Sequence, residues 1–427
     1  MRLLNVHSLQ LEKYDDIEET PEYAILSHRW SKNEMRFGHF QGADWDTLRK
    51  SAIDGGKEDE IGIAKILSAC AVTKSFALDY LWIDTCCIDG SSSTEVTQAI
   101  NSMFRWYQRA SVCLAYLFDV STDTSELGHM IDRRLYARKK TQILRIGPFE
   151  DSQWFRRGWT LQELLAPPEL VFYDHAWRRI GVKTDMTKQI QAATRIDPKY
   201  LTGDFEDASI ATKLSWVSDR TTTLPDDMAY CMVGILGVSM DTRYGEEERA
   251  FMRLQELLIE KVADDSIFAW TDPTLSPSQG LGLLAPSPAC FRNSSKIHSR
   301  GPNYNRKTQP PQITSLGLRL SAPAGLSALS KRHVLFLDCW EAERGSLHAV
   351  TILLGKDKNG TWRRYSCNKL LLRPKPTRLR KLGQGMRSKS FLVPQRVMED
   401  VVRPVFHSHF GDSELDTCSS SGWSVKV

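Results

Sequence analysis

The feature that most constrains the fold is a regular alternation of short apolar runs with helical patterns. Apolar runs at Tyr23–Trp30, Tyr80–Asp84 and Val112–Phe118 each have the length of a buried strand. Between them, apolar residues recur at helical spacing over 61–77 and 92–107. A strand, helix, strand, helix, strand order implies right-handed crossovers and a parallel sheet. Because such sheets bind ligands at the carboxyl ends of their strands, we expect a functional site there.

The pattern continues further along the chain. A basic stretch, Arg133–Arg145, predicts an inserted helix, and a fourth apolar run, Leu170–Asp174, predicts another strand. Residues 184–264 predict helices beside the sheet, including an apolar helix over Met228–Leu236. Beyond Asp272 the chain becomes rich in Pro, Gly and Ser, with short runs in which apolar and polar residues alternate. This pattern is typical of a small β-rich domain.

The predicted fold class is therefore α/β, with a parallel sheet elaborated by helices and followed by a smaller β-rich domain. The expected domain limits are 1–270 for the first domain (α/β core about 20–180, helical part about 184–265), 271–290 for a linker, 291–411 for the β-rich domain and 412–427 for a flexible tail.

Composition indicates a soluble globular protein. No stretch approaches the roughly 20 apolar residues of a membrane-spanning helix, and the first residues lack the pattern of a signal peptide. The nine cysteines are scattered, except for the neighbours Cys86 and Cys87, and fit neither a disulfide framework nor a zinc site. We therefore expect a cytoplasmic protein with no transmembrane segment and no bound metal.

The charge is divided unevenly along the chain. Residues 292–396 hold 22 Lys or Arg against four Asp or Glu, whereas residues 1–291 hold 32 against 43. A basic segment can attract nucleic acid or an anionic membrane. The favoured interpretation is that it faces water or docks on its own acidic neighbour.

One short stretch, Trp154–Pro168, could be structural or catalytic. Thr160 and Glu163 have the spacing of a capping box, in which each side chain satisfies a free N–H at a helix start. The same stretch crowds two tryptophans and two arginines around the Glu163 carboxylate. A carboxylate in such surroundings could also stabilise the cleavage of a sugar-to-base bond.

Four stretches in order resemble the successive blocks of the fungal heterokaryon-incompatibility (HET) domain. They are Tyr23–Trp30, Leu81–Asp89, Ala99–Tyr107 and Arg157–Leu165. The resemblance covers roughly residues 1–265, and the part that follows is similar to a poorly characterised region found after this domain in some members. It implies a role in non-self recognition, in which incompatible partners trigger programmed cell death.

A remoter resemblance bears on the chemistry. A strand ending in Ser-His-Arg, a strand ending in Ile-Asp and a later helix with Trp159 and Glu163 look like the Toll/interleukin-1 receptor (TIR) domain. This resemblance implies a TIR-like, flavodoxin-like sheet, and NAD as a substrate with no permanently bound cofactor. Glu163 would be the catalytic carboxylate. The Trp-to-Glu spacing here is four residues, whereas the TIR pattern usually has three.

The other candidate residues each have a structural alternative. Trp159 could stack on a base or belong to the core. Arg29 could bind a diphosphate or form an ion pair, and His28 could transfer protons or simply pack. Ser27 and Asp84 belong to the strand ends where NAD would bind, and Asp84 could hold ribose hydroxyls or form a turn.

Three further positions carry weaker hypotheses. Asp89 fits turn formation better than ribose binding. Cys86 and Cys87 fit buried thiols better than nucleophiles. Arg156 and Arg157 could meet phosphate or pair with the acidic residues at 150–151.

Two functions of different classes remain open. The first is an NAD-cleaving enzyme in cell-death signalling, centred on Glu163. The second is a non-enzymatic module that kills by self-association or by binding another incompatibility protein, in which Glu163 is only a cap. Contact of residues 292–396 with nucleic acid or anionic membrane is a third, less favoured hypothesis.

Overall fold

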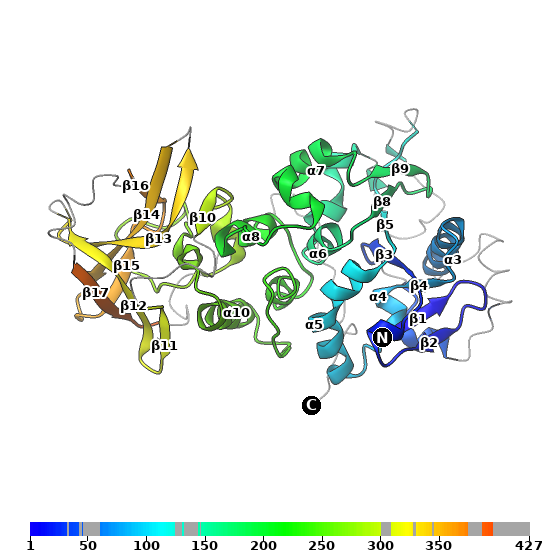
Figure 1. The fold of residues 1–427 in the computed structure, drawn as a ribbon, viewed down its shortest axis with the longest axis horizontal. Helices are drawn as coiled ribbons and strands as arrows, with labels where there is room; N and C mark the ends of the chain where they lie inside the picture. The colour runs from blue at the N-terminus through cyan, green and yellow to red at the C-terminus, as the bar shows by residue number, and fades with distance from the viewer. Residues whose placement is uncertain are drawn as a thin grey trace. The chain divides into compact units, whose positions relative to one another are not determined.

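A computed structural model describes residues 1–31, 34–41, 45, 60–123, 130–131, 144–145, 147–299, 309–327, 330–343, 346–374 and 387–395. The described residues form two compact units (Figure 1). Unit 1 comprises 1–204 with 220–222, and unit 2 comprises 205–219 with the described residues from 223 onward.

Unit 1 is built on a seven-stranded mixed sheet in the order β2-β1-β4-β3-β5-β8-β9. Its four central strands, β4, β3, β5 and β8, are parallel, whereas β2, β1 and β9 add antiparallel pairs at the two edges. The predicted parallel sheet is thus confirmed at its centre and wrong at its edges. The strands are β1 (Arg2–Asn5), β2 (Leu11–Lys13), β3 (Ala24–His28), β4 (Tyr80–Trp82), β5 (Val112–Tyr116), β8 (Leu170–Tyr173) and β9 (Arg179–Val182).

The four parallel strands lie in the spatial order second, first, third, fourth along the chain. This is the order of the first four strands in flavodoxin-like sheets, and the direction of winding reverses between the first and third strands. Here that switch point lies between β3 and β5. A ligand crevice is expected beyond the carboxyl ends of these two strands.

Helices cover both faces of this sheet. α3 (Glu60–Ser75) follows β3, α5 (Ser93–Arg109) follows β4, and α6 (Thr160–Leu165) precedes β8. Because right-handed crossovers in opposite directions place helices on opposite faces, α3 lies on one face, and α5 and α6 on the other (Figure 1). α5 buries the apolar stripe that its sequence predicts, including Val96, Ile100 and Met103.

The core of unit 1 is aromatic. Trp82, Tyr107, Trp154, Phe155 and Phe172 are all fully buried. Trp82 contacts Tyr107 edge to face, and Trp154 contacts Phe155 and Phe172 in the same way. Large rings that interlock in this way fix the position of the segment carrying α6 against β8.

Several local predictions for unit 1 need correction. The apolar run predicts a strand to Asp84, but β4 ends at Trp82 and Asp84 begins the short helix α4 (Asp84–Cys87). Leu144 and Arg145, expected at the end of a helix, form strand β7 (Leu144–Arg145), which pairs with β6 (Met130–Ile131). The remainder of the predicted inserted helix, 133–143, lies outside the described residues. Ser92 caps the start of α5 by accepting from the Glu95 N–H, and the Glu95 carboxylate accepts from the N–H of Asp89.

Short helices follow the sheet in chain order. They are α7 (Thr187–Thr194), α8 (Ile210–Val217), α9 (Asp227–Tyr230) and α10 (Glu248–Lys261). The predicted helix over Met228–Leu236 is wrong, because only four residues are helical and the apolar run continues as turns. Its backbone is satisfied by short-range bonds such as Val233 N–H to the Tyr230 carbonyl.

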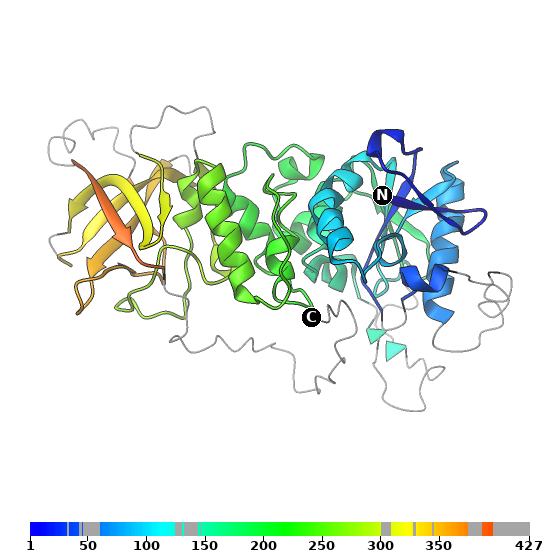
Figure 2. The same cartoon turned by 90° about the horizontal axis from the view of Figure 1, so that it is seen from below.

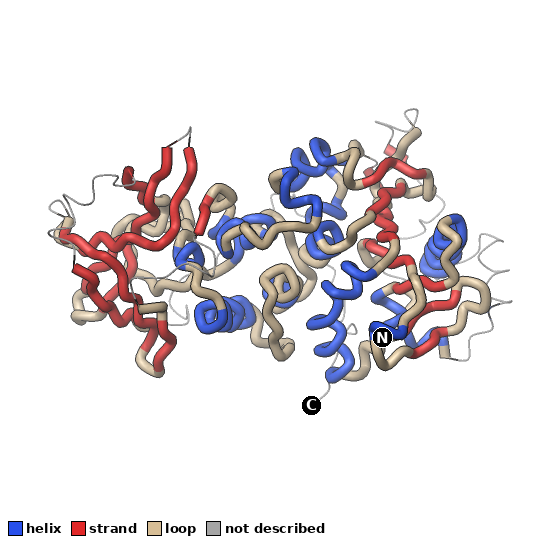
Figure 3. The backbone as a smooth tube through the Cα atoms, in the orientation of Figure 1, coloured by secondary structure: helices blue, strands red, loops and turns tan. Residues whose placement is uncertain are grey.

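Unit 2 contains an eight-stranded antiparallel sheet (Figures 2 and 3). Its strands are β10 (Ile297–Ser299), β11 (Gln312–Thr314), β12 (Gly317–Leu326), β13 (His333–Glu343), β14 (Ser346–Lys356), β15 (Trp362–Tyr365), β16 (Leu371–Pro374) and β17 (Arg387–Val393). The expectation of a β-rich C-terminal part is confirmed. The expected flexible tail, 412–427, lies outside the described residues.

The compact units divide near residue 205, whereas the sequence predicts a domain boundary at 271–290. α8 and α10 therefore belong to the same unit as the antiparallel sheet. Within the described parts of both units, no helix is long and apolar enough to cross a membrane.

Candidate functional site

Glu163 does not cap a helix. α6 begins at Thr160, and the residue at the N-cap position is Trp159, which makes no side-chain cap. The Thr160 hydroxyl points backward and donates to the carbonyls of Trp154 and Arg157. The capping-box interpretation of Thr160 and Glu163 is therefore wrong, and the Glu163 carboxyl group is left for another role.

The Glu163 side chain reaches the end of the first parallel strand. It accepts a hydrogen bond of 2.5 Å from the Ser27 hydroxyl on β3. Ser27 in turn accepts from the indole N–H of Trp154 at 2.8 Å. All three side chains are buried, and Ser27 and Trp154 are fully so. This chain of hydrogen bonds holds the carboxyl group in one place at the carboxyl end of β3.

The surroundings of Glu163 favour its protonated form. Burial, followed by the negative charge of Asp84, raises its pKa to about 8. The Ser27 hydroxyl and the positive charges of Arg157 and Arg220 act in the opposite direction. A buried acidic group whose pKa is raised by a neighbouring acidic group at a sheet end is a common arrangement in active sites.

Asp84 lies at the start of α4, directly after β4. Its Oδ2 accepts from the indole N–H of Trp30 at 2.8 Å. Its Oδ1 is buried and has no hydrogen-bond partner among the residues that the structure describes. Burial raises the pKa of Asp84. The predicted alternative of a simple turn residue does not explain this free, buried oxygen.

His28 follows Ser27 on β3, so its side chain points to the opposite face of the sheet, where it lies beside Asp84. Its Nε2 is 4.0 Å from Asp84 Oδ1 and 3.7 Å from Glu34 Oε2. Both distances are too long for a direct hydrogen bond. Within the described part of the chain, His28 Nε2 has no hydrogen-bond partner. His28 is therefore more than a satisfied packing residue.

A buried ion pair supports His28, and the sequence did not predict it. Glu34 Oε1 accepts from Lys65 Nζ and from both the N–H and the hydroxyl of Ser31. Burial alone would raise the pKa of Glu34, but His28 and Lys65 hold it well below its usual range. The Lys65 side chain is buried in α3, although lysines are mostly exposed, so its residue type gave no sign of this pair.

Arg29 directly follows β3, and Trp159 occupies the N-cap position of α6. Arg29 is exposed, and its guanidinium lies 5.8 Å from the centre of the Phe118 ring. Partial burial of the group and the nearby charge of Arg157 lower its pKa. Trp159 is half-buried. Both residues belong to segments that border the ends of β3 and α6, as the sequence predicts.

The remaining candidates have structural roles. Asp89 accepts from the N–H and hydroxyl of Ser91, as expected for a turn. Cys86 and Cys87 are buried, and burial raises the pKa of Cys86 well above its usual value. This favours the interpretation of the two residues as buried thiols over that of catalytic nucleophiles. The described residues contain no group of His, Cys, Asp or Glu that could hold a metal ion.

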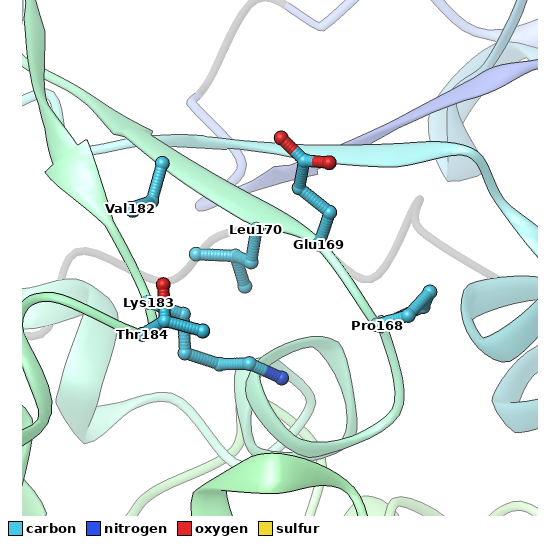
Figure 4. A pocket seen from close by; sticks show the side chains of 6 residues that line it. All are labelled: Pro168, Glu169, Leu170, Val182, Lys183 and Thr184. Carbon is cyan, nitrogen blue, oxygen red and sulfur yellow. The ribbon is translucent and has the colours of Figure 1, made fainter.

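A separate pocket of about 200 Å³ lies at the amino end of β8 and the end of β9 (Figure 4). It is lined by Pro168, Glu169, Leu170, Val182, Lys183 and Thr184. The Lys183 ammonium donates to the carbonyls of Leu164 and Pro167, so it satisfies the carboxyl end of α6. In Figure 4 its ammonium and the Glu169 carboxylate point in different directions. This pocket contains none of the residues around Glu163.

The residues that form the cluster lie in a segment that matches a known sequence family. Residues 23–163 match the family described as heterokaryon incompatibility protein (HET). Residues 23–163 are a HET domain. The matched segment begins just before β3 and ends at Glu163, so the HET domain contributes Ser27, His28, Asp84 and Glu163 to the site. Residues 249–307 match a second family, described as a domain of unknown function (DUF8212).

A characterised relative supports this assignment. The HET-domain chain is 37% identical over 238 residues to the vegetative incompatibility protein HET-E-1 of Podospora anserina. The match covers 55% of this chain and 16% of the relative, so the chain spans only a small part of that protein. No solved structure matches the chain.

Proposed function

We propose that this HET-domain protein acts in fungal non-self recognition and triggers programmed cell death by TIR-like cleavage of NAD. The family match and the relative named as a vegetative incompatibility protein support the biological role. The chemical role is supported by the geometry around Glu163. The protein acts in the cytoplasm, and its activity is switched on by self-association or by another incompatibility protein.

One observation carries the proposal: a buried glutamate at the switch point of a parallel sheet is held by Ser27 instead of capping its helix. Buried acidic groups are costly, and they persist mainly where function requires them. The position also fits, because ligands of such sheets bind beyond the carboxyl ends of the strands at the switch point.

Glu163 has the properties needed to break the bond between ribose and nicotinamide. In the free protein its pKa of about 8 keeps most of it protonated at neutral pH. The nicotinamide ring of NAD is positively charged, and a cation beside a carboxyl group favours its ionised form. As the bond breaks, positive charge develops on the ribose, and the ionised Glu163 stabilises it.

The neighbouring residues would orient the substrate. Ser27 positions Glu163, and Asp84 can accept hydrogen bonds from ribose hydroxyls. Arg29, exposed near Arg157, can bind the diphosphate, since a guanidinium pairs with phosphate oxygens in a bidentate way. Trp159 offers an aromatic surface against which a ring can stack.

The test is NAD content and nicotinamide release in cells that express the full chain, compared with Glu163→Gln. Gln keeps the size and hydrogen bonding of Glu but cannot ionise. Glu169→Gln is the matched control, because Glu169 is an exposed carboxylate six residues along the same segment. Circular dichroism of the purified proteins verifies equal folding.

We expect wild type and Glu169→Gln to deplete NAD before death and Glu163→Gln to preserve it. Death with intact NAD in all three would overturn the enzymatic proposal. The chain would then be a self-assembling signalling module, and oligomerisation of the purified protein without NAD consumption would identify it as such.

A further inference from the structure

A second polar cluster lies on the opposite side of β3 from Glu163. Ser27 and His28 are consecutive residues of this strand, so their side chains point to opposite faces of the sheet. Ser27 contacts Glu163 on the face covered by α6, whereas His28 faces Glu34 and Lys65 on the face covered by α3. Asp84 Oδ1 lies 4.0 Å from His28 Nε2, and the negative charge of Asp84 also raises the pKa of Glu163.

The atoms of this cluster leave one polar position open. Glu34 Oε1 is saturated by Lys65 and Ser31, and Asp84 Oδ2 is used by Trp30. The other oxygen of each carboxylate faces His28 Nε2, at 3.7 Å for Glu34 and 4.0 Å for Asp84. The His28 side chain is only 1% exposed and that of Glu34 only 4%. His28 Nε2 and Asp84 Oδ1 are both buried and have no hydrogen-bond partner among the described residues, so a water molecule between them could donate one hydrogen to each.

We propose that His28 and Asp84 bind the water molecule that attacks the ribose, with His28 as its general base. This inference rests on the proposed NAD cleavage and deepens it. His28 and Asp84 accept the two hydrogens of the water, and Glu34, fixed by Lys65, lies beside the imidazole. The sequence predicted proton transfer at His28 as one of two alternatives, but it gave no role to Glu34 or Lys65.

The chemistry balances without any further reactant. The water oxygen forms a bond to C1′ of the ribose as the bond from C1′ to the nicotinamide nitrogen breaks. Nicotinamide leaves as a neutral molecule with the bonding electron pair. The proton lost by the water passes to His28 Nε2 and then to solvent. A water held on the other side of the strand end from Glu163 can approach the ribose from a different direction, as in glycosidases that bind their water opposite the leaving group.

A competing nucleophile separates this role from that of Glu163. The nitrogen of 3-acetylpyridine attacks C1′ without losing a proton, so its exchange for nicotinamide needs no general base. Hydrolysis does need one. The ratio of ADP-ribose to the 3-acetylpyridine analogue of NAD therefore reports on the base alone, whereas total nicotinamide release reports on bond cleavage.

The experiment uses the purified full chain with NAD and 3-acetylpyridine. We expect His28→Gln to lower the ratio by about tenfold or more, since general bases typically contribute at least 100-fold to a rate, while exchange continues. His7→Gln is the control, because His7 also contacts an aspartate but is exposed. Should His28→Gln fail to fold, Asp84→Asn removes the second partner of the water at a side chain that is 21% exposed, and it should lower the ratio in the same direction.

An unchanged ratio in a folded variant that still releases nicotinamide would overturn the assignment of His28 and leave the role of Glu163 standing. Absence of nicotinamide release from wild type, under conditions where it kills cells, would overturn both proposals together.

Discussion

The hydroxyl of Ser27 on β3 donates to the carboxyl group of Glu163 on α6, across 2.5 Å and 136 residues of sequence. This contact ties α6 to the first parallel strand. Glu163 lies in the first turn of α6, but its side chain reaches β3 instead of the free N–H groups at the helix start. The energetic and chemical consequences of this contact can be measured.

Ser27→Ala should destabilise the protein by about 1–3 kcal/mol, because it leaves the buried Trp154 N–H without its acceptor. Urea unfolding followed by tryptophan fluorescence measures the change. Ser93→Ala, at an exposed serine in α5, is the control and should change the free energy of unfolding by no more than about 0.5 kcal/mol. Equal effects of the two substitutions would show that the Ser27 contact contributes nothing.

Glu163→Gln should become more stable relative to wild type as the pH rises. The pKa of Glu163 is about 8 in the folded protein and near 4.5 when unfolded, so between these values the folded state holds the proton more tightly. Its contribution to stability is therefore present at low pH and is lost as the pH rises toward 8. The stability difference should change by up to about 1.4 kcal/mol per pH unit.

Paired unfolding measurements of Glu163→Gln and wild type at pH 5.5, 7 and 8.5 test this. Glu169→Gln should show no such trend, since Glu169 is exposed. A stability difference for Glu163→Gln that stays constant with pH would mean that Glu163 is ionised in the folded protein.

The proposed NAD cleavage should accelerate with pH. If ionised Glu163 is the active form, kcat/KM rises about tenfold per pH unit below its pKa of about 8 and levels off above it, because kcat/KM reports the pKa of the free enzyme. Initial rates of nicotinamide release between pH 6 and 9 give the profile. A rate that falls over this range would show that protonated Glu163 is the catalytic form.

Lys65→Met should lower the free energy of unfolding more than most substitutions in unit 1. It leaves Glu34 buried and ionised without its cationic partner, which typically costs about 3–5 kcal/mol. Because the pKa of Glu34 lies well below its usual range in the folded protein, this carboxylate stabilises the fold above its unfolded pKa, and that stabilisation is lost as the pH falls.

Two variants make the Lys65 measurement specific. Lys74→Met changes an exposed lysine in the last turn of the same helix and should have little effect. The double variant with Glu34→Gln should recover part of the loss, because it removes the unpaired charge. A double variant as unstable as the sum of its parts would show that the two side chains do not interact.

The central strands and the long helices were predictable because their patterns are strong. β3, β4, β5 and β8 are continuous apolar runs, and α5 has a clear apolar stripe. The edge strands β1, β2 and β9 were missed because they are partly exposed and interrupted by polar residues, so they form no continuous apolar run. The helix prediction for Met228–Leu236 was wrong because a fully buried segment is apolar on every side, whether it is helical or made of turns.

The site was partly predictable. Polar residues directly after the apolar runs identified Ser27, His28 and Asp84, and the topology then brought them together with Glu163. The pair of Glu34 and Lys65 was missed because it joins a loop to a helix 31 residues away, and such a contact leaves no periodic pattern in the sequence. Whether Glu163 was a cap or part of a site could not be decided from spacing, because both depend on which neighbour the side chain contacts.

The ties at the start of α6 extend beyond the part of the chain that the HET family shares. The N–H of Gly158 donates to the Thr221 carbonyl, the N–H of Thr221 donates to the Arg156 carbonyl, and Arg220 donates to Thr160. Four of the seven strands in this sheet, β1, β2, β8 and β9, also lie outside residues 23–163. The segment that matches the HET family therefore contains only three of the seven strands of its sheet. A fragment cut at its limits would lose the other four strands and the contacts of Arg220 and Thr221 that hold the start of α6, so evolutionary and physical boundaries differ in this protein.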